Sequence, residues 1–271
     1  LQVLGQRIQR IGIQWQAGDD GYPLAAPAGH LAGDPHLGLP GCRRLLERGW
    51  LAAVVLAVAT AVRAEMPEYA RAALNAFSPE PPAGWAYTLT TVRNEEARAT
   101  ARFDPSQPPA TRWTLLELNG APASAGDVEK YARARASDTT PASAQGAFQR
   151  RDIDPATVTL VSETASQGEF TCRFREEAAG ANKMLGHLVL RLTINKQLPY
   201  VEKYVLELQE PYSPILGVKM RELRVEGTFA APSEGRPALP LRQTSHFVGR
   251  MFFIGVEENL ALTYQNFALA H

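Results

Sequence analysis

Three histidines and one cysteine are the side chains beyond residue 64 whose chemistry best suits catalysis or metal binding. His187, His246 and His271 are far apart in the sequence. A metal site would also need an acidic or sulfur partner at a defined spacing. Cys172 lies on the apolar side of an expected strand, where a buried and unreactive thiol is the simplest interpretation. We therefore expect no metal site and no catalytic cysteine.

The sequence contains no GxSxG, HExxH, GxGxxG or phosphate-loop motif. Its acidic pairs all fall at expected turns: Glu95–Glu96, Asp152–Asp154, Glu176–Glu177 and Glu257–Glu258. Catalytic carboxylates must converge across a cleft, whereas neighbours in a turn are usually solvated. We expect no catalytic residue and no cofactor. A hydrolase of the cell envelope, which would need a His paired with Ser and Asp, ranks last among the hypotheses.

Charge is balanced over the chain, with 28 Lys and Arg against 28 Asp and Glu. This balance gives no electrostatic footprint for nucleic acid. Two basic clusters, Arg133 with Arg135 and Arg150 with Arg151, flank a polar loop. They could steer an acidic partner or anionic lipid head groups, although a solvated basic loop is the simpler explanation.

Residues 42–64 resemble a signal peptide. Arg43, Arg44 and Arg48 supply a positive region, an apolar run follows over residues 50–62, and Ala64 ends a small-residue cleavage site. The rival interpretation is a retained membrane anchor, but the run is shorter than the roughly 20 residues that a spanning helix needs. We expect a cleaved leader, a periplasmic protein and no stable membrane span after cleavage.

Residues 1–41 are rich in Gly, Pro, Ala, Asp and His and show no apolar period. Such a composition buries too little surface to offset the entropy of ordering. We expect a disordered extension or a mis-called upstream start. Residues 65–271 would then form a single domain, in which Cys172 has no disulfide partner.

The pattern beyond residue 65 is mostly that of strands. A helix is expected over residues 66–77 and another over residues 127–136, where Ser124 and Asp127 form a capping box. Apolar and polar residues alternate elsewhere, which predicts about ten strands. These strands are expected at residues 85–92, 99–103, 113–118, 157–163, 169–175, 188–194, 204–208, 223–229, 239–248 and 260–267.

Alternation over so many strands predicts an antiparallel sheet with one dry face and one wet face. A sheet of about ten strands must curl or close, and two helices are too few to cover it flat. We therefore expect an α+β fold, mainly antiparallel β. It would be a strongly curved open half barrel of about ten strands with two helices over the concave face.

The apolar rows of this sheet must face a dry interior, which a guest molecule could share with the two helices. Core packing alone would also explain them. The predicted lining of a ligand cavity is Phe170, Phe174, Leu188, Leu190, Leu192, Ile194, Leu206, Leu223 and Val225. A further apolar cluster, residues 251–254, is expected to be a corner of the core, with an exposed rim as the alternative.

Several turn and strand motifs carry a family resemblance. They are Trp-Thr-Leu-Leu-Glu-Leu-Asn-Gly at 113–120, Gly-Thr-Phe at 227–229, Leu-Pro at 239–240 and Tyr-Gln-Asn-Phe at 264–267. With the helix after the leader, this layout resembles the periplasmic lipoprotein-carrier superfamily of the LolA/LolB type, as an uncharacterised secreted relative. The resemblance covers most of residues 65–271, and it implies the half-barrel fold and a lipid-sized cavity.

The expected function is that of a non-catalytic periplasmic protein that binds or transfers a hydrophobic ligand. Its partner would be an acyl chain, a lipid or a lipoprotein, held in the concave face of the sheet. The alternative is a structural or protein-interaction module of the cell envelope, whose core is filled by its own side chains and whose surface contacts an envelope protein. Nucleic acid is not an expected partner.

Overall fold

The computed structural model describes residues 66–137 and 148–270. These residues build one antiparallel sheet of eleven strands and three α-helices. The strands are β1 (Trp85–Arg93), β2 (Ala97–Phe103), β3 (Trp113–Leu118), β4 (Ala121–Pro122), β5 (Thr159–Glu163), β6 (Gln167–Cys172), β7 (Leu188–Asn195), β8 (Tyr200–Leu208), β9 (Val218–Ala230), β10 (Leu239–Met251) and β11 (Ile254–Leu269).

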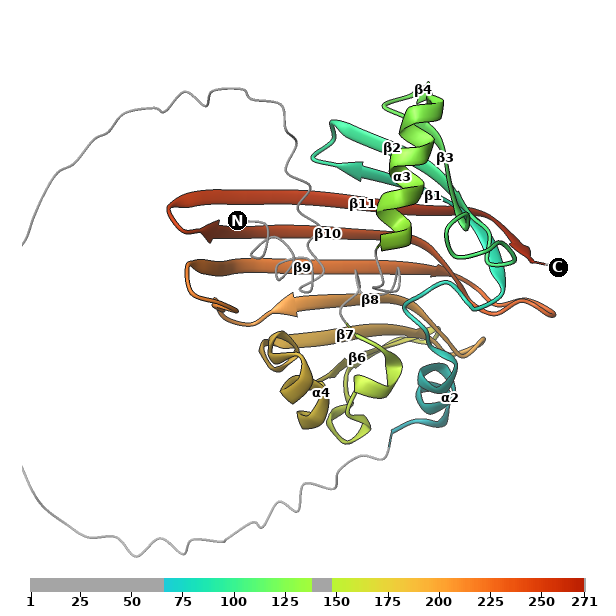
Figure 1. The fold of residues 1–271 in the computed structure, drawn as a ribbon. Coiled ribbons are helices and arrows are strands. Elements are labelled where there is room, and N and C mark those ends of the chain that lie inside the picture. The colour runs from blue at the N-terminus through green and yellow to red at the C-terminus, as the bar shows by residue number, and fades with distance from the viewer. Residues whose placement is uncertain (1–65, 138–147, 271) are drawn as a thin grey trace, which may run out of the picture. The chain divides into compact units, whose positions relative to one another are not determined.

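The strands follow the order β4-β3-β2-β1-β11-β10-β9-β8-β7-β6-β5 (Figure 1). Every neighbour is the next strand along the chain except at one place, where β1 pairs with β11. The predicted mainly antiparallel α+β class is therefore confirmed, with β4 and β5 as the two open edges. The strong curvature of a half barrel stays a prediction.

Local sequence signals explain how the elements begin and end. Asn119 and Gly120 have φ angles of 51° and 80°, as a two-residue hairpin turn requires. Asp127 donates its backbone N–H to Ser124 Oγ (3.2 Å), and the Ser124 N–H is donated to Asp127 Oδ2 (3.3 Å). The predicted capping box is confirmed, and it starts helix α3 (Ala125–Ser137).

Helix α2 (Glu68–Ala76) occupies the predicted first helix. Ala70, Ala73, Leu74 and Phe77 recur at the spacing of one helical face, and all four are buried. A third helix, α4 (Glu176–Ala181), was not predicted. It has only six residues, and the acidic pair Glu176–Glu177 at its start was interpreted as part of a turn. Three short 3₁₀ helices accompany it: η2 (Arg150–Asp152), η3 (Pro155–Thr157) and η4 (Lys183–His187).

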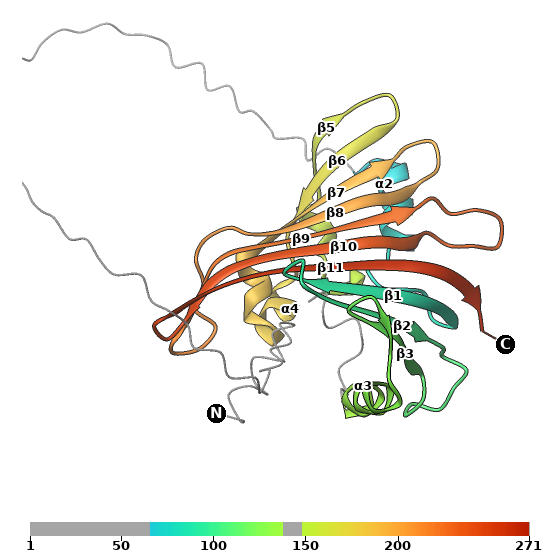
Figure 2. The same cartoon turned by 90° about the horizontal axis from the view of Figure 1, so that it is seen from above.

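Helices α2 and α3 lie on the same face of the sheet. Helix α2 contacts β7 and β8, and α3 contacts β3 (Figure 2). Tyr204, on β8 near α2, donates from its hydroxyl to Gln243 Oε1 (3.3 Å), and Gln243 pairs with Leu262 of β11. Paired residues on neighbouring strands project from the same face. Leu262 belongs to the apolar cluster near α3, so one face carries both helices.

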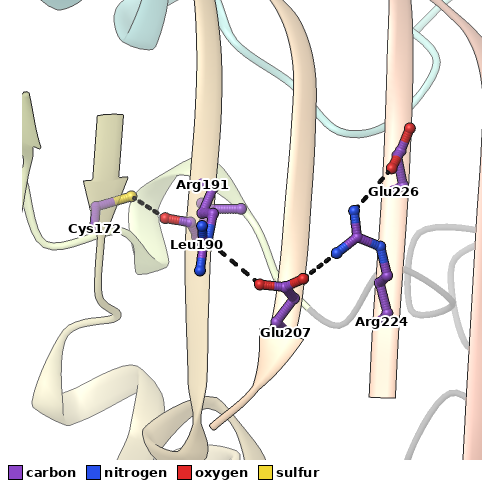
Figure 3. Close-up of polar contacts among 6 residues, drawn as sticks. All are labelled: Cys172, Leu190, Arg191, Glu207, Arg224 and Glu226. Atoms are coloured by element: carbon purple, nitrogen blue, oxygen red, sulfur yellow. Dashed lines mark hydrogen bonds and ion pairs between the residues drawn. The ribbon is translucent and has the colours of Figure 1, made fainter. Parts of the chain in front are cut away.

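The opposite face carries the charged residues of β7, β8 and β9, as alternation predicted, together with the buried Val189 and Val205. Arg191 Nε lies 3.3 Å from Glu207 Oε2, and Glu207 also pairs with Arg224 (Figure 3). The row continues through Glu226, whose carboxylate is 3.2 Å from Arg224 and 2.8 Å from Lys203. Positive and negative side chains thus lie next to one another along this row. The contacts with Lys203 and Arg224, chiefly the hydrogen bond from Lys203, hold the pKa of Glu226 below its ordinary value.

Strands β10 and β11 are longer than predicted. They continue to a tight hairpin, so that Glu257 and Glu258 lie within β11 and not in a turn. The expectation that residues 251–254 form a core corner is wrong, because Phe253 is 95% exposed and Ile254 is 64% exposed at the hairpin tip. An apolar run at a strand end looks the same in sequence whether the strand stops before it or passes through it.

Some expectations fall on residues that the structure does not describe. The upstream segment 1–41, the leader 42–64 and most of the polar loop after α3 lie outside the described residues. Within residues 66–137 and 148–270, none of the helices has the length and apolar character to cross a membrane.

Candidate functional site

The predicted cavity-lining residues lie together on the helix-bearing face, in the larger of two apolar clusters. We call this cluster the α2 core. Eight of the residues are buried, with exposures of 8% or less: Phe170, Phe174, Leu188, Leu190, Leu192, Ile194, Leu206 and Val225. Leu223 is partly buried against them. The sequence therefore grouped these residues correctly, and their role as the walls of a ligand cavity stays a prediction.

Aromatic side chains from outside the sheet pack into the α2 core. Phe77, at the end of α2, makes edge-on ring contacts with Tyr204 (6.1 Å between centroids) and Phe229 (5.6 Å). Phe148 lies beside Phe77 (6.3 Å) and approaches Tyr204 (5.6 Å) and Phe174 (5.4 Å). Edge-to-face rings at these separations are the preferred aromatic arrangement. This part of the face is thus occupied by the protein's own side chains.

Helix α2 is also tied to the sheet by polar contacts. Tyr69 donates from its hydroxyl to Glu163 Oε1 (2.8 Å), and Lys196 Nζ lies 2.9 Å from the same oxygen. The hydrogen bond from Lys196 and then that from Tyr69 hold the pKa of Glu163 below its ordinary value. Burial and the contact with Glu163 raise the pKa of Tyr69 to about 12. These contacts join α2 to β5 and to the end of β7.

The second apolar cluster lies on β1, β2, β3 and β11, and it is covered less completely. We call it the aromatic cluster; its members are Tyr87, Leu89, Phe103, Trp113, Leu260, Leu262, Tyr264 and Phe267. Tyr87 is central, with ring centroids of Phe103, Tyr264 and Phe267 at 5.0, 5.7 and 5.6 Å. Three members are buried, namely Tyr87, Leu89 and Leu262, and the other five are only partly buried.

Helix α3 lies over this cluster without a buried residue of its own between Ala125 and Arg135. Its ring contact with the sheet is between Tyr131 and Trp113, 6.5 Å apart and edge-on. The Arg135 guanidinium lies 4.9 Å from the Trp113 ring centroid and 5.2 Å from that of Tyr131. Arg135 also donates to the Tyr131 hydroxyl (3.2 Å). The helix therefore contacts the cluster through the ring of Tyr131 and a cation–π clamp formed by Arg135, and its residues between Ala125 and Arg135 are at most half-buried.

A carboxylate stands close to the aromatic cluster. Glu80 Oε1 is buried and has no hydrogen-bond partner among the described residues. Burial first, and then the negative charge of Glu80, raise the pKa of Tyr264 to about 12. Burial also raises the pKa of Tyr87 strongly. Both phenols are therefore neutral hydrogen-bond donors at neutral pH, and Glu80 offers an unused acceptor beside them.

Cys172 is placed as the sequence predicted. It is 1% exposed in the α2 core, and its thiol lies 3.6 Å from the Leu190 carbonyl (Figure 3). Burial raises the pKa of this thiol to about 12. The thiolate that nucleophilic chemistry requires is therefore strongly disfavoured at neutral pH.

The two described histidines lie apart on different elements. His187 stacks on Tyr212, with ring centroids 4.1 Å apart, and its Nδ1 is 3.7 Å from Glu210. His246 Nδ1 is 2.8 Å from Asn259 Oδ1, and Nε2 is 3.9 Å from Glu222. Within the described part of the chain, no three His, Cys, Asp or Glu residues are grouped so that they could hold a metal ion.

One of the four acidic pairs, Asp152 with Asp154, caps local structure. Asp152 Oδ2 accepts the Gln149 N–H (2.7 Å), and Asp154 Oδ1 accepts the Ala156 N–H (2.9 Å). Glu258 lies in β11 and pairs with Arg93 at 3.2 Å. Caps explain Asp152 and Asp154, and a cross-strand ion pair explains Glu258.

The aromatic cluster was missed as a site, although its residues were visible in the sequence. Alternation predicted that Tyr87 and Leu89 share a face, but nothing in one sequence pairs β1 with β11 across the whole chain. A local signal existed nonetheless, because large aromatic residues recur on successive N-terminal strands at 87, 103 and 113. Strands that are rich in aromatic residues and lie beside a polar helix indicate a candidate binding surface.

Comparisons with protein-family models, with curated proteins and with solved structures found no match to this chain. The resemblance to the lipoprotein carriers therefore stays a prediction from the sequence motifs. A function for this chain has to be inferred from the two apolar clusters and the polar groups around them.

Proposed function

We propose that this chain is a non-catalytic periplasmic protein that binds or transfers a hydrophobic ligand, an acyl chain of a lipid or lipoprotein. The guest binds on the aromatic cluster beneath α3, and the sheet curves around it as a half barrel of the carrier type. The cleaved leader and the periplasmic location are parts of the same proposal.

One observation carries the proposal: the incomplete cover of the aromatic cluster. Five of its eight members are only partly buried, and α3 brings no buried residue to them between Ala125 and Arg135. Exposed aromatic surface is costly in water, and an acyl chain laid over it would contribute about 0.8 kcal/mol for each CH₂ buried. Helix α3 supplies a lid whose cation–π clamp can open at small cost.

The polar rim suits a guest that is not purely hydrocarbon. The buried oxygen of Glu80 is available to accept a hydrogen bond from a guest, and the neutral Tyr264 hydroxyl is able to donate one. A buried polar group without a partner is destabilising, so a ligand that supplies one gains affinity. An acyl ester, amide or glycerol moiety carries groups of this kind.

The α2 core favours the second candidate function, a structural or protein-interaction module. Its predicted lining residues pack against Phe77 and Phe148 and against one another. A core filled in this way needs no guest. The two hypotheses therefore assign different roles to the two ends of the same face, and the guest is proposed only for the end beneath α3.

The test is a titration of the full chain with the fluorescent fatty acid cis-parinaric acid. We expect saturable binding, and about a tenfold loss of affinity in Phe103→Ala with Phe267→Ala, since each ring contributes apolar contact area. The matched control is Phe253→Ala, which removes a ring that is 95% exposed at the opposite end of β10 and β11. No binding, or equal affinity in all three proteins, would refute the proposal.

Glu80→Leu sharpens the same experiment. If Glu80 serves a guest, its removal weakens binding of a polar acyl ligand such as a monoacylglycerol but leaves cis-parinaric acid bound. The substitution should not lower the free energy of unfolding, because it replaces a buried oxygen that has no partner in the described structure. A lower stability without any change in ligand preference would assign Glu80 a structural role.

A further inference from the structure

A pocket lined by arginines lies on the α2 side of the molecule, away from the aromatic cluster. Its volume is about 610 Å³, within the range of small-molecule sites. Its walls come from α2, η2, η3 and the start of α4, and consist of Met66, Arg71, Leu74, Asn75, Gln149, Arg150, Arg151, Ile153, Pro155 and Arg175. Four of these ten residues are arginines and none is acidic.

The arginines reach the pocket from three separate segments. Arg71 projects from α2, Arg150 and Arg151 from η2, and Arg175 from the residue that precedes α4. Arg150 is held in place, since it donates to the Asn75 carbonyl (3.1 Å) and to Asn75 Oδ1 (2.9 Å). Arg71 donates to the Met66 carbonyl at 3.4 Å. The guanidinium group of Arg150 is thus oriented by neutral oxygens, and these two hydrogen bonds leave its positive charge in place.

Four carboxylates lie near the pocket without lining it. Asp152 is 4.0 Å from Arg151 Nε, but its other oxygen accepts the Gln149 backbone N–H. Glu176 and Glu177 occupy the first turn of α4, next to Arg175 in sequence, and Glu68 begins α2. None of these four acids contributes to the pocket wall. The wall itself therefore presents positive charge to whatever enters.

We propose that this pocket binds an oxyanion, a phosphate or a carboxylate, joined to a small apolar moiety. A planar guanidinium donates two parallel hydrogen bonds to such a group, which makes arginine the preferred residue for this recognition. The apolar part would lie on Met66, Leu74, Ile153 and Pro155. The site does not depend on the proposed function, because it shares no residue with the aromatic cluster.

The same chemistry could come from a free anion or from the head group of an amphiphile. Isothermal titration of the full chain with inorganic phosphate, hexyl phosphate and neutral hexanol separates these sources. Binding of phosphate alone, with competition against hexyl phosphate, identifies a free-anion site. Binding of hexyl phosphate without measurable binding of phosphate identifies an amphiphile head-group site. In both cases hexanol is expected not to bind, since the anionic group is the determinant.

The variant Arg151→Gln with Arg175→Gln tests the location. Neither of these side chains is among those that hydrogen-bond to α2 in the described structure, so folding should persist. We expect affinity for hexyl phosphate to fall about tenfold or more, as the loss of charge-assisted hydrogen bonds implies. The control is Arg221→Gln with Arg236→Gln, which makes the same charge change at exposed positions on β9 and the following turn, and should change affinity less than about twofold.

Two outcomes would overturn the inference. One is that neither phosphate nor hexyl phosphate binds at millimolar concentration. The other is that both double variants lose affinity equally, which would mean general attraction to positive charge. Phe103→Ala with Phe267→Ala is included as a third protein, because it should keep hexyl phosphate binding even if the acyl-chain proposal fails.

Discussion

The helix-bearing face of the sheet is covered differently at its two ends. At the α2 end, the four residues of one helical stripe are buried, and aromatic rings from residues 77 and 148 fill the space above the sheet. At the α3 end, the rings belong to the sheet, and the covering helix offers a guanidinium and one phenol. The same sheet is therefore sealed at one end and lightly covered at the other.

The α2 end of this face therefore contributes more to the stability of the fold, whereas the α3 end is held more loosely. Helix α2 is fixed by its apolar stripe, by Tyr69 with Glu163, and by Asn75 with Arg150. Helix α3 begins with a capping box, which stabilises the helix itself but not its attachment. Local stability follows buried apolar contact, so α3 should open at lower free energy than α2.

Truncating one leucine in each half should give the largest contrast. Leu190→Ala removes a side chain with 0% exposure from the α2 core, and a loss of about 2–5 kcal/mol in the free energy of unfolding is expected. Leu260→Ala in the aromatic cluster, where the side chain is only partly buried, should cost clearly less, about 1–2 kcal/mol. Urea denaturation measures both, and equal losses would contradict the division into two halves.

A pair of glycines gives a second test of packing density. A methyl group at Gly227 of β9 would overlap the Tyr204 ring in the α2 core, whereas one at Gly255 of β11 would meet no atom within 4 Å. Gly227→Ala should therefore cost about 1–3 kcal/mol in the free energy of unfolding, as overpacking typically does.

Gly255→Ala serves as the matched control for the same chemical change on a neighbouring part of the sheet. Its effect should stay within about 0.5 kcal/mol of zero. If Gly227→Ala proved equally mild, the α2 core would have room to spare, and the ligand cavity first predicted there would regain support.

The attachment of α2 should depend on pH. The folded-state pKa of Glu163 is lowered by Lys196 and Tyr69, so its contribution to stability is present above its unfolded pKa of about 4.3 and disappears as pH falls through the folded value. Glu163→Gln should lower Tm at pH 7, and the difference from the parent protein should shrink as pH falls through the folded pKa of Glu163. A difference that is constant across this range would mean that the carboxylate charge does not matter.

Most of the fold could be predicted from the alternation of apolar and polar residues and from the turn residues. The strand faces of Leu188–Ile194 and Phe170–Cys172, the Asn119–Gly120 turn and the capping box of α3 were all predictable, because each depends on residues close together in sequence. The failures were of another kind. The ends of β10 and β11, and helix α4, depend on which strands extend past their neighbours and on where the chain returns.

The candidate sites were harder to predict than the fold. The aromatic cluster forms only because β1 pairs with β11, and the arginine pocket only because residues 71, 150 and 175 meet. The sequence marked Arg150 and Arg151 as a basic pair, but it could not show that two further arginines join them. Sites made by distant segments follow from topology, which periodicity does not specify.

The smallest effect on stability is expected for the residue that should matter most for exchange of the guest. Arg135→Ala removes the cation–π clamp on Trp113, whose energy at a partly exposed site is about 0.5–1 kcal/mol. Tm should hardly change, but amide hydrogen exchange in α3 should accelerate while that in α2 does not. Release of cis-parinaric acid should also become faster, because opening of α3 precedes departure of the guest.

Arg133→Ala is the control, since Arg133 pairs with Glu129 on the exposed side of the same helix. Unchanged hydrogen exchange in α3 would mean that the helix is held by contacts other than the clamp. It would contradict the inference that α3 opens more readily than α2 because its cover of the sheet is light.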